Sequence, residues 1–232
     1  SNVLGNKLDL KKICEIAHKN NCLVLVDAAQ SVSHMKIDVK DLDCDFLTFS
    51  GHKMFAVNGI GVLYGKRKLL ERLEPLIYGG DMIRSVSLQR IDFAEIPRKF
   101  EGGTQNVAAV YSLGKAIDYI NDIGIDKIGN YIRDLNEYAI EKLGKIKYIE
   151  IYSNGKYGII SFNLKGIHSH DVAEYLSAKR IAVRAGHMCC QPLMFRLGIG
   201  SVVRISFQIY NDKNDVDILI ENLNKCVEFF KR

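Results

Sequence analysis

A carboxylate and a lysine each follow directly after an apolar stretch of this 232-residue sequence. Asp27 directly follows the apolar residues 22–26. Lys53 ends the run Ser50-Gly-His-Lys53, which begins at the last residue of the apolar stretch 46–50. Alone, such an Asp is typical of a helix cap or a solvated turn, and most lysines are surface charges. Buried strands of an open α/β sheet place ligands at their carboxyl ends, so both side chains should face one crevice. The pair therefore favours a pyridoxal cofactor, in which the lysine forms the Schiff base and the carboxylate keeps the pyridine nitrogen protonated.

A second group of reactive side chains lies in the run Arg184-Ala-Gly-His-Met-Cys189-Cys190. A cysteine in a glycine-containing loop just after a short strand, with Arg and His nearby, is placed to react as a thiolate. A metal site formed by His187 and the two cysteines is less favoured, because adjacent ligands fit tetrahedral zinc poorly and no fourth ligand is apparent. A merely buried thiol is also disfavoured by the glycine and the charged neighbours. This run is therefore predicted to carry a nucleophilic thiol.

The composition excludes several classes of protein. Apolar residues make up 47% and charged residues 25%, as in ordinary globular proteins. The net charge is +5, but the basic residues are scattered, which argues against nucleic-acid binding. No apolar run approaches the roughly 20 residues that a membrane-spanning helix needs. The six cysteines contain no C-x-x-C pair and do not form a secreted disulfide pattern, so a cytoplasmic location is predicted.

Apolar periodicity predicts alternating strands and helices, which is typical of an α/β fold. We expect residues 1–118 to be part of a large, mainly parallel-sheet domain and residues 119–232 to form a small α+β domain. Residues 75–103 read as a long irregular stretch, of the kind that is usually functional or interfacial. The strands are expected at 22–26, 46–50, 59–64, 147–152, 157–164, 181–184 and 202–207, and the helices at 8–19, 105–123, 126–143, 169–179 and 213–230. The first of these strands should be buried on both faces, because its apolar run is continuous.

Six short motifs occur in one order along the whole chain. Together they resemble those of SufS-type cysteine desulfurases, within the class V aminotransferase-like branch of fold-type I pyridoxal-phosphate enzymes. The short loop from Gly186 to Pro192 favours this type over the NifS/IscS type, whose cysteine loop is longer. The motifs are Ser1-Asn-Val-Leu-Gly, Leu-Val-Asp27-Ala-Ala-Gln30, Ser50-Gly-His-Lys53, Phe100-Glu-Gly-Gly-Thr104, Arg184-x-Gly-His-x-Cys189 and Arg204-x-Ser-x-x-x-Tyr-Asn.

The resemblance implies a set of cofactor contacts for pyridoxal 5'-phosphate. Lys53 would hold the cofactor covalently, Asp27 would pair with its pyridinium nitrogen, and Gln30 would hydrogen-bond its ring hydroxyl. The residues implied to bind phosphate are Ser50 and His52 and, for the cofactor of the partner subunit in a homodimer, Thr104.

The resemblance also implies the substrate and the reaction. Asn2, Arg184 and Arg204 would hold the carboxylate of L-cysteine, or of L-selenocysteine. Cys189 would take the sulfur as a persulfide while alanine leaves, and His187 would manage protons. A sulfur-acceptor protein of the SufE or SufU type would then carry the sulfur toward iron–sulfur cluster assembly or another sulfur-transfer route.

Three departures from the family pattern leave alternatives open. Met188 stands where a second His is frequent, and Cys190 stands where a small residue is usual, so Cys190 could accept the persulfide or only fill space. The family's first two-fifths are absent, so the chain alone is expected to bind the cofactor weakly and turn over poorly. The remaining alternatives are a selenocysteine lyase, a kynureninase-like or epimerase-like enzyme that needs no nucleophilic Cys189, and an inactive remnant.

Overall fold

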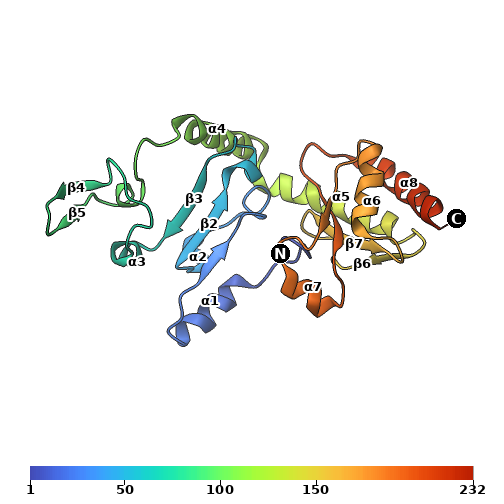
Figure 1. Cartoon of the computed structure of the whole chain (residues 1–232), viewed down its shortest axis with the longest axis horizontal. Helices are drawn as coiled ribbons and strands as arrows, with labels where there is room; N and C mark the ends of the chain where they lie inside the picture. The colour runs from blue at the N-terminus through green and yellow to red at the C-terminus, as the bar shows by residue number, and fades with distance from the viewer. Residues whose placement is uncertain (232) are drawn as a thin grey trace. The chain divides into compact units, whose positions relative to one another are not determined.

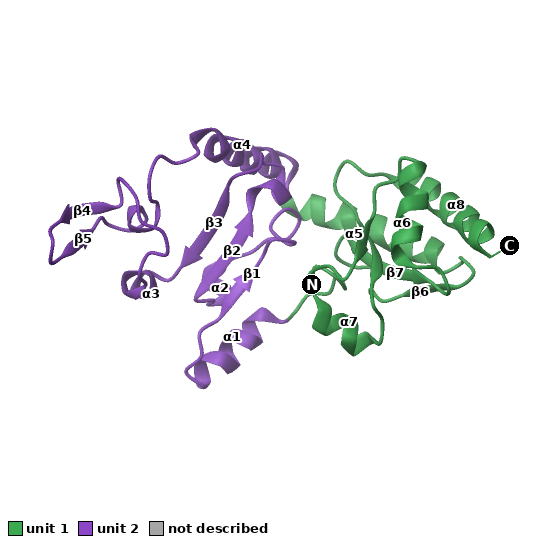
Figure 2. Ribbon diagram, in the orientation of Figure 1, with its two compact units in different colours: residues 1–8, 125–232 green, residues 9–124 purple. Residues whose placement is uncertain are grey.

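The computed structural model describes residues 1–231, which form two compact units (Figures 1 and 2). Unit 1 comprises Ser1–Leu8 together with the chain from Ile125 onward, and unit 2 comprises Asp9–Gly124. The chain passes from unit 2 to unit 1 after Gly124, six residues beyond the boundary predicted after residue 118. Residues 1–8 belong to unit 1, together with the C-terminal part of the chain. The functional division at residue 118 stays a prediction. Across the described chain, every helix is too short or too polar to cross a membrane.

Unit 2 is built on a three-stranded sheet with the order β1-β2-β3. Strands β1 and β2 are parallel, whereas β2 and β3 are antiparallel, so this part of the sheet is mixed. The elements in chain order are α1 (Leu10–Lys19), β1 (Leu25–Asp27), α2 (Val39–Leu42), β2 (Phe46–Ser50), η1 (Gly51–Met54), β3 (Gly61–Gly65), α3 (Arg67–Arg72), β4 (Ile83–Val86), β5 (Ile91–Phe93), η2 (Arg98–Phe100) and α4 (Val107–Ile123).

Strand β1 corrects one expectation about burial. Val26 is buried in a cluster that includes Cys14 of α1 and Leu47 of β2. Leu25 points to the opposite face of the sheet and is 59% exposed. Leu63 of β3 is also largely exposed, at 53%. Successive strand residues face opposite sides, so the continuous apolar run fills only one packed face here. The prediction of a strand buried on both faces is therefore wrong for the described chain.

Several short elements were not predicted from the sequence. The stretch 75–103 contains the antiparallel hairpin of β4 and β5 and is not wholly irregular. Helices α2 and α3 of unit 2, and α7 of unit 1, have four, six and seven residues. Runs this short span at most two turns, so their apolar periodicity is too weak to identify them. By contrast, β2 and the final helix have the predicted bounds.

Unit 1 is built on a four-stranded antiparallel sheet with the order β6-β7-β9-β8. Helix α8 packs against both α5 and α6, and α5 and α6 each contact β7. A capping box between Asp212 and Asp215 begins α8. The elements are α5 (Ile125–Leu143), β6 (Ile149–Ile151), β7 (Ile159–Leu164), α6 (Ser169–Ala178), β8 (Arg184–Gly186), α7 (Gln191–Leu197), β9 (Val202–Ser206) and α8 (Lys213–Phe230).

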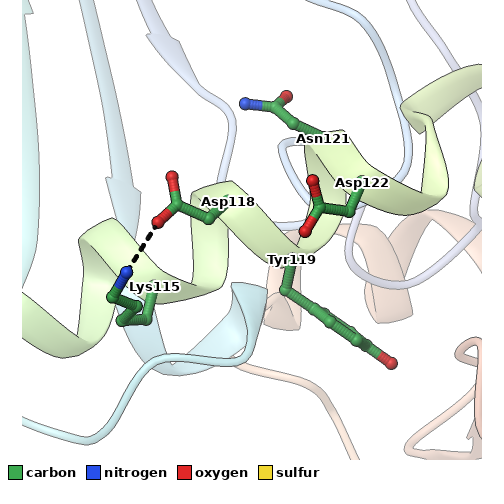
Figure 3. A pocket seen from close by; sticks show the side chains of 5 residues that line it. All are labelled: Lys115, Asp118, Tyr119, Asn121 and Asp122. Carbon is green, nitrogen blue, oxygen red and sulfur yellow. Dashed lines mark hydrogen bonds and ion pairs between the residues drawn. The ribbon is translucent and has the colours of Figure 1, made fainter.

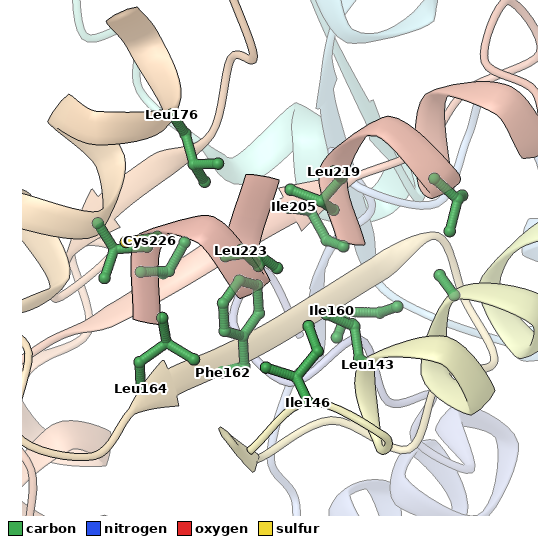
Figure 4. Packing of buried hydrophobic residues seen from close by; sticks show 14 of the residues in the cluster. Leu143, Ile146, Ile160, Phe162, Leu164, Leu176, Ile205, Leu219, Leu223 and Cys226 are labelled. Carbon is green, nitrogen blue, oxygen red and sulfur yellow. The ribbon is translucent and has the colours of Figure 1, made fainter. Parts of the chain in front are cut away.

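The two faces of the β7–β9 pair have different surroundings. Ile160, Phe162 and Leu164 of β7 point into the helix-covered core, and they meet Val203 and Ile205 of β9 there (Figure 4). Because side chains alternate along a strand, the intervening residues must face the other side of the sheet. That other face is where Arg204 and Ser161 lie.

The N-terminal segment crosses this other face of the unit 1 sheet. Val3 is fully buried, and its carbonyl accepts a hydrogen bond from the Ser161 hydroxyl at 2.6 Å. Gly5 has φ +62°, and a Cβ atom there would stand 2.5 Å from the Ile159 carbonyl oxygen. Only glycine fits both the left-handed backbone and this close approach. The segment is therefore fixed in place by the strand beneath it.

Replacing Gly5 by Ala should destabilise unit 1 by more than about 1 kcal/mol, because an L-residue is strained at this φ and the carbonyl cannot move aside. Urea unfolding followed by circular dichroism measures the change. Gly200→Ala is the matched control in the same unit, since a Cβ there meets nothing within 4 Å. Equal stability of the Gly5→Ala and Gly200→Ala proteins would contradict this role for Gly5.

Candidate active site

In unit 2 the predicted cofactor residues gather at the carboxyl ends of two parallel strands. Asp27, the last residue of β1, pairs in register with Thr48 of β2. Strand β2 ends two residues later at Ser50, and η1 follows immediately with His52 and Lys53. The side chains of Asp27, His52 and Lys53 are all exposed. The structure thus brings the carboxylate and the lysine to the same end of the sheet, where α/β proteins place their ligands.

In the loop after β1, a local hydrogen bond holds Asp27, and Gln30 lies within the turns that follow. Asp27 Oδ1 accepts from the backbone N–H of Ala29 at 2.9 Å. Residues 28–35 then form tight turns, with N–H groups returning to the carbonyls of Ala28 and Ser31. His34 anchors the end of this loop, where it is buried. Its Nδ1 lies 3.3 Å from the Ser33 hydroxyl, and its Nε2 has no hydrogen-bond partner.

Thr104 lies in the same unit, in the loop that precedes α4. It is exposed and stands just before Asn106, which caps α4. A hollow along α4 lies beyond it and contains none of the predicted site residues (Figure 3). Its lining includes the Lys115–Asp118 ion pair at 3.1 Å. The role of Thr104 at the cofactor of the partner subunit stays a prediction.

In unit 1 two arginines lie opposite each other on neighbouring strands. Arg184 of β8 pairs in register with Arg204 of β9. Burial, and then the charge of Arg184, lower the pKa of the Arg204 guanidinium. Its Nε is buried without a hydrogen-bond partner. Like charges directly across a sheet are destabilising, and a buried donor requires an acceptor. Both features fit a site for an anion such as a carboxylate.

Asn2 connects these arginines to the cysteine turn. Its backbone carbonyl accepts from Arg204 at 3.0 Å, and its side-chain Nδ2 donates to the Met188 carbonyl at 2.9 Å. Met188 and Cys189 have φ values of +54° and +57°. Each non-glycine residue in this left-handed region costs roughly 1–2 kcal/mol. Cys189 is exposed, whereas Cys190 is partly buried against an apolar cluster.

Two histidines lie near this turn. His187 is exposed, and its carbonyl accepts from the Cys190 N–H at 2.9 Å. His170, which the sequence reasoning did not single out, places its Nε2 3.7 Å from where a Cβ of Gly186 would stand. The sequence indicates a role for His170 only weakly, through the pair His168-Ser-His170 at the start of the helix predicted from residue 169. His187 is thus beside Cys189 in the chain, and its catalytic role stays a prediction.

The donor sets suit an organic cofactor and a carboxylate better than a metal ion. Among residues 1–231, no three His, Cys, Asp or Glu side chains are grouped so that they could hold a metal. Unit 2 instead offers a carboxylate, an amine, a hydroxyl and an imidazole at one sheet end. These are the groups that a phosphorylated pyridine aldehyde requires, so the residues present fit pyridoxal phosphate.

Comparison with known families identifies the class. The aminotransferase class-V family matches residues 1–219, and the chain belongs to that family, whose enzymes depend on pyridoxal phosphate. The chain is, more narrowly, a homologue of the cysteine desulfurases. It is 48% identical over 231 residues to a probable cysteine desulfurase of Halalkalibacterium halodurans, covering 99% of this chain and 57% of that protein. A probable cysteine desulfurase of Staphylococcus aureus is likewise 48% identical over 233 residues, with 99% and 56% covered.

Solved structures agree with this assignment. The cysteine desulfurase CsdA of Escherichia coli superposes with a TM-score of 0.95 at 37% identity, over 99% of this chain and 57% of that one. The apo cysteine desulfurase of Thermococcus onnurineus has a TM-score of 0.93 at 38% identity, with 99% and 58% covered. The α/β fold is therefore that of the cysteine desulfurases over part of their length. The chain spans a little over half the length of these relatives.

The loop anchored by His34 should make unit 2 sensitive to acid. Burial lowers the pKa of His34 to about 4, whereas an unfolded histidine titrates near its ordinary value of 6.5. The unfolded chain therefore binds a proton that the folded chain refuses, so stability is lost as the pH falls from about 6.5 to 4. The loss is on the order of 3 kcal/mol.

Urea unfolding at several pH values between 4 and 7 measures this slope. In His34→Asn the slope should be much flatter, whereas His52→Asn, at an exposed histidine of the same unit, should retain it. The same slope in His34→Asn as in the unsubstituted protein would contradict the assignment.

Proposed function

We propose that this chain is part of a cysteine desulfurase, in which Lys53 anchors pyridoxal phosphate and Cys189 receives sulfur from L-cysteine. The observation that carries the proposal is the arginine pair of unit 1. An incompletely bonded, partly buried guanidinium at Arg204 is tied through Asn2 to the turn that exposes Cys189. Unit 1 thus combines a binding site for a carboxylate with an exposed thiol, and the desulfuration of an amino acid uses both groups. Membership of the desulfurase homologues supports the same reaction.

The cofactor would be held by residues of unit 2. Lys53 would bind it covalently, Asp27 would pair with its pyridine nitrogen, and Gln30 would bond its ring hydroxyl. Ser50 and His52 would bind its phosphate. When bound in this way, the cofactor supplies an electron sink for the carbon atoms of the substrate.

The residues of unit 1 would bind and attack the substrate. Arg184 and Arg204 offer planar, bidentate donors to the carboxylate of L-cysteine. The Cys189 thiolate attacks the substrate sulfur, so that a sulfur–sulfur bond forms as the carbon–sulfur bond breaks. Lys53, freed when the substrate amine replaces it, would take the Cα proton of the substrate and later return a proton to Cα. The Cβ carbon would keep the electron pair of the broken carbon–sulfur bond and gain the proton that Cys189 gives up, and alanine would leave. His187 takes the proton of the Cys189 thiol.

The remaining contacts concern other chains and other substrates. We infer a homodimer in which Thr104 reaches the phosphate of the partner subunit's cofactor. The Cys189 persulfide would pass to an acceptor protein of the SufE or SufU type, for iron–sulfur cluster assembly or other sulfur transfer. L-Selenocysteine would fit the same arginines, so a selenocysteine lyase is the neighbouring alternative.

The vicinal cysteines give the decisive test. Cys189→Ser should reduce sulfide release from L-cysteine, with reductant present, by more than roughly a thousandfold, because the nucleophile is lost. Cys190→Ala should retain activity, because Cys190 packs against the apolar cluster of Met188 and Met194. Sulfide and alanine are measured together with pyridoxal phosphate in excess.

The outcomes separate the competing assignments. Full activity of Cys189→Ser would exclude the desulfurase mechanism and favour an enzyme of the same family that needs no thiol. Loss of activity in Cys190→Ala but not in Cys189→Ser would show that Cys190, and not Cys189, carries the persulfide. Failure of borohydride to fix the cofactor on Lys53, even in a protein that also carries the family's N-terminal portion, would favour an inactive remnant.

A further inference from the structure

The turn that exposes Cys189 is strained and must be held by its surroundings. Met188 and Cys189 are consecutive left-handed residues, and neither is a glycine. Such conformations persist only where neighbouring groups determine them. Within the turn, one hydrogen bond is local, from the Cys190 N–H to the His187 carbonyl at 2.9 Å. The other restraints come from residues far away in the sequence.

The distant restraints come from the segment Ser1–Gly5. The Met188 side chain is 4% exposed and packs in one cluster with the fully buried Val3. The Met188 carbonyl accepts from Asn2 Nδ2 at 2.9 Å. A carbonyl oxygen only accepts, so the amide nitrogen of Asn2 must face it. Asn2 is thus the polar restraint on the peptide group that joins Met188 to Cys189.

The base beneath Asn2 is itself rigid. The Asn2 carbonyl accepts from Arg204 Nη1 at 3.0 Å, and the next carbonyl, of Val3, accepts from Ser161 at 2.6 Å. Both partners belong to the central strands of the unit 1 sheet. The sheet therefore fixes the backbone at Asn2, and the Asn2 side chain holds the cysteine turn through Met188.

We propose that Asn2 is a positioning residue for Cys189, which fixes the left-handed turn through Met188, in addition to the contact with the substrate carboxylate that the resemblance implies. Its amide nitrogen carries two N–H groups, and the Met188 carbonyl accepts from one of them. The catalytic consequence rests on the proposed desulfurase function, whereas the structural consequence does not.

The structural test uses hydrogen–deuterium exchange on this chain. Asn2→Leu keeps the approximate shape of the side chain and removes the donor without adding charge. The Cys190 amide should exchange about fivefold faster or more, because the turn opens more often once the bond is lost. Asn222→Leu is the matched control, since Asn222 also donates its amide to a backbone carbonyl, that of Ile218 at 2.8 Å, elsewhere in unit 1. It should leave the Cys190 amide unchanged.

Two results would overturn the structural part. Unchanged exchange at Cys190 in Asn2→Leu would show that the bond does not hold the turn. Equal acceleration at Cys190 and at the β7 amides of residues 160–164 would show that Asn2 only supports the fold of unit 1.

Steady-state kinetics of sulfide release separate positioning from substrate binding. A positioning role lowers kcat for Asn2→Leu about fivefold or more, whether or not KM for L-cysteine also rises. A raised KM with unchanged kcat would make Asn2 a carboxylate ligand only and refute the proposal. Absence of sulfide release from an unsubstituted protein that also carries the family's N-terminal portion would instead refute the proposed function, while the exchange result would still decide the role of Asn2 in the turn.

Discussion

The alternation of side chains along β7 and β9 is the constraint on which the unit 1 site depends. One face of these strands is apolar and lies under the helices, and its burial fixes the register of the sheet. A slip of one residue would move Phe162 into the site and Arg204 into the core. The apolar core thus sets the place of the arginines without touching them. The burial of apolar side chains on the helix-covered face also stabilises the sheet enough to offset the repulsion between Arg184 and Arg204 on the other face.

The two units use different physical means to place their predicted site residues. In unit 2, parallel strands end together, so chain direction alone brings Asp27 and Lys53 to the same sheet end. In unit 1 the strands are antiparallel, and the functional residues come from a cross-strand pair, a terminal segment and a strained turn. The first arrangement follows from topology. The second requires specific contacts between residues far apart in sequence.

This difference explains what the sequence could predict. Asp27 and Lys53 were found from apolar runs and the residues that follow them, and the desulfurase homology was found from motif order. Helix α8 was predicted with its observed bounds because its apolar period and its cap agree. The β4–β5 hairpin and α7 were missed because short elements carry little periodicity. Leu25 was misjudged because a continuous apolar run does not say which of its two faces is covered.

The link from Asn2 to Met188 was beyond sequence reasoning for a physical reason. Glycine marks left-handed turns in a sequence, but here Met188 and Cys189 adopt that conformation, and no local preference of either residue predicts it. Tertiary contacts outweigh local propensity at this turn, as they often do at functional sites. The same contacts distinguish the adjacent thiols: the turn leaves Cys189 exposed and directs Cys190 toward apolar side chains. Two residues that are equivalent in the sequence thus become an exposed thiol and a packing group, and the difference arises from the conformation of the turn.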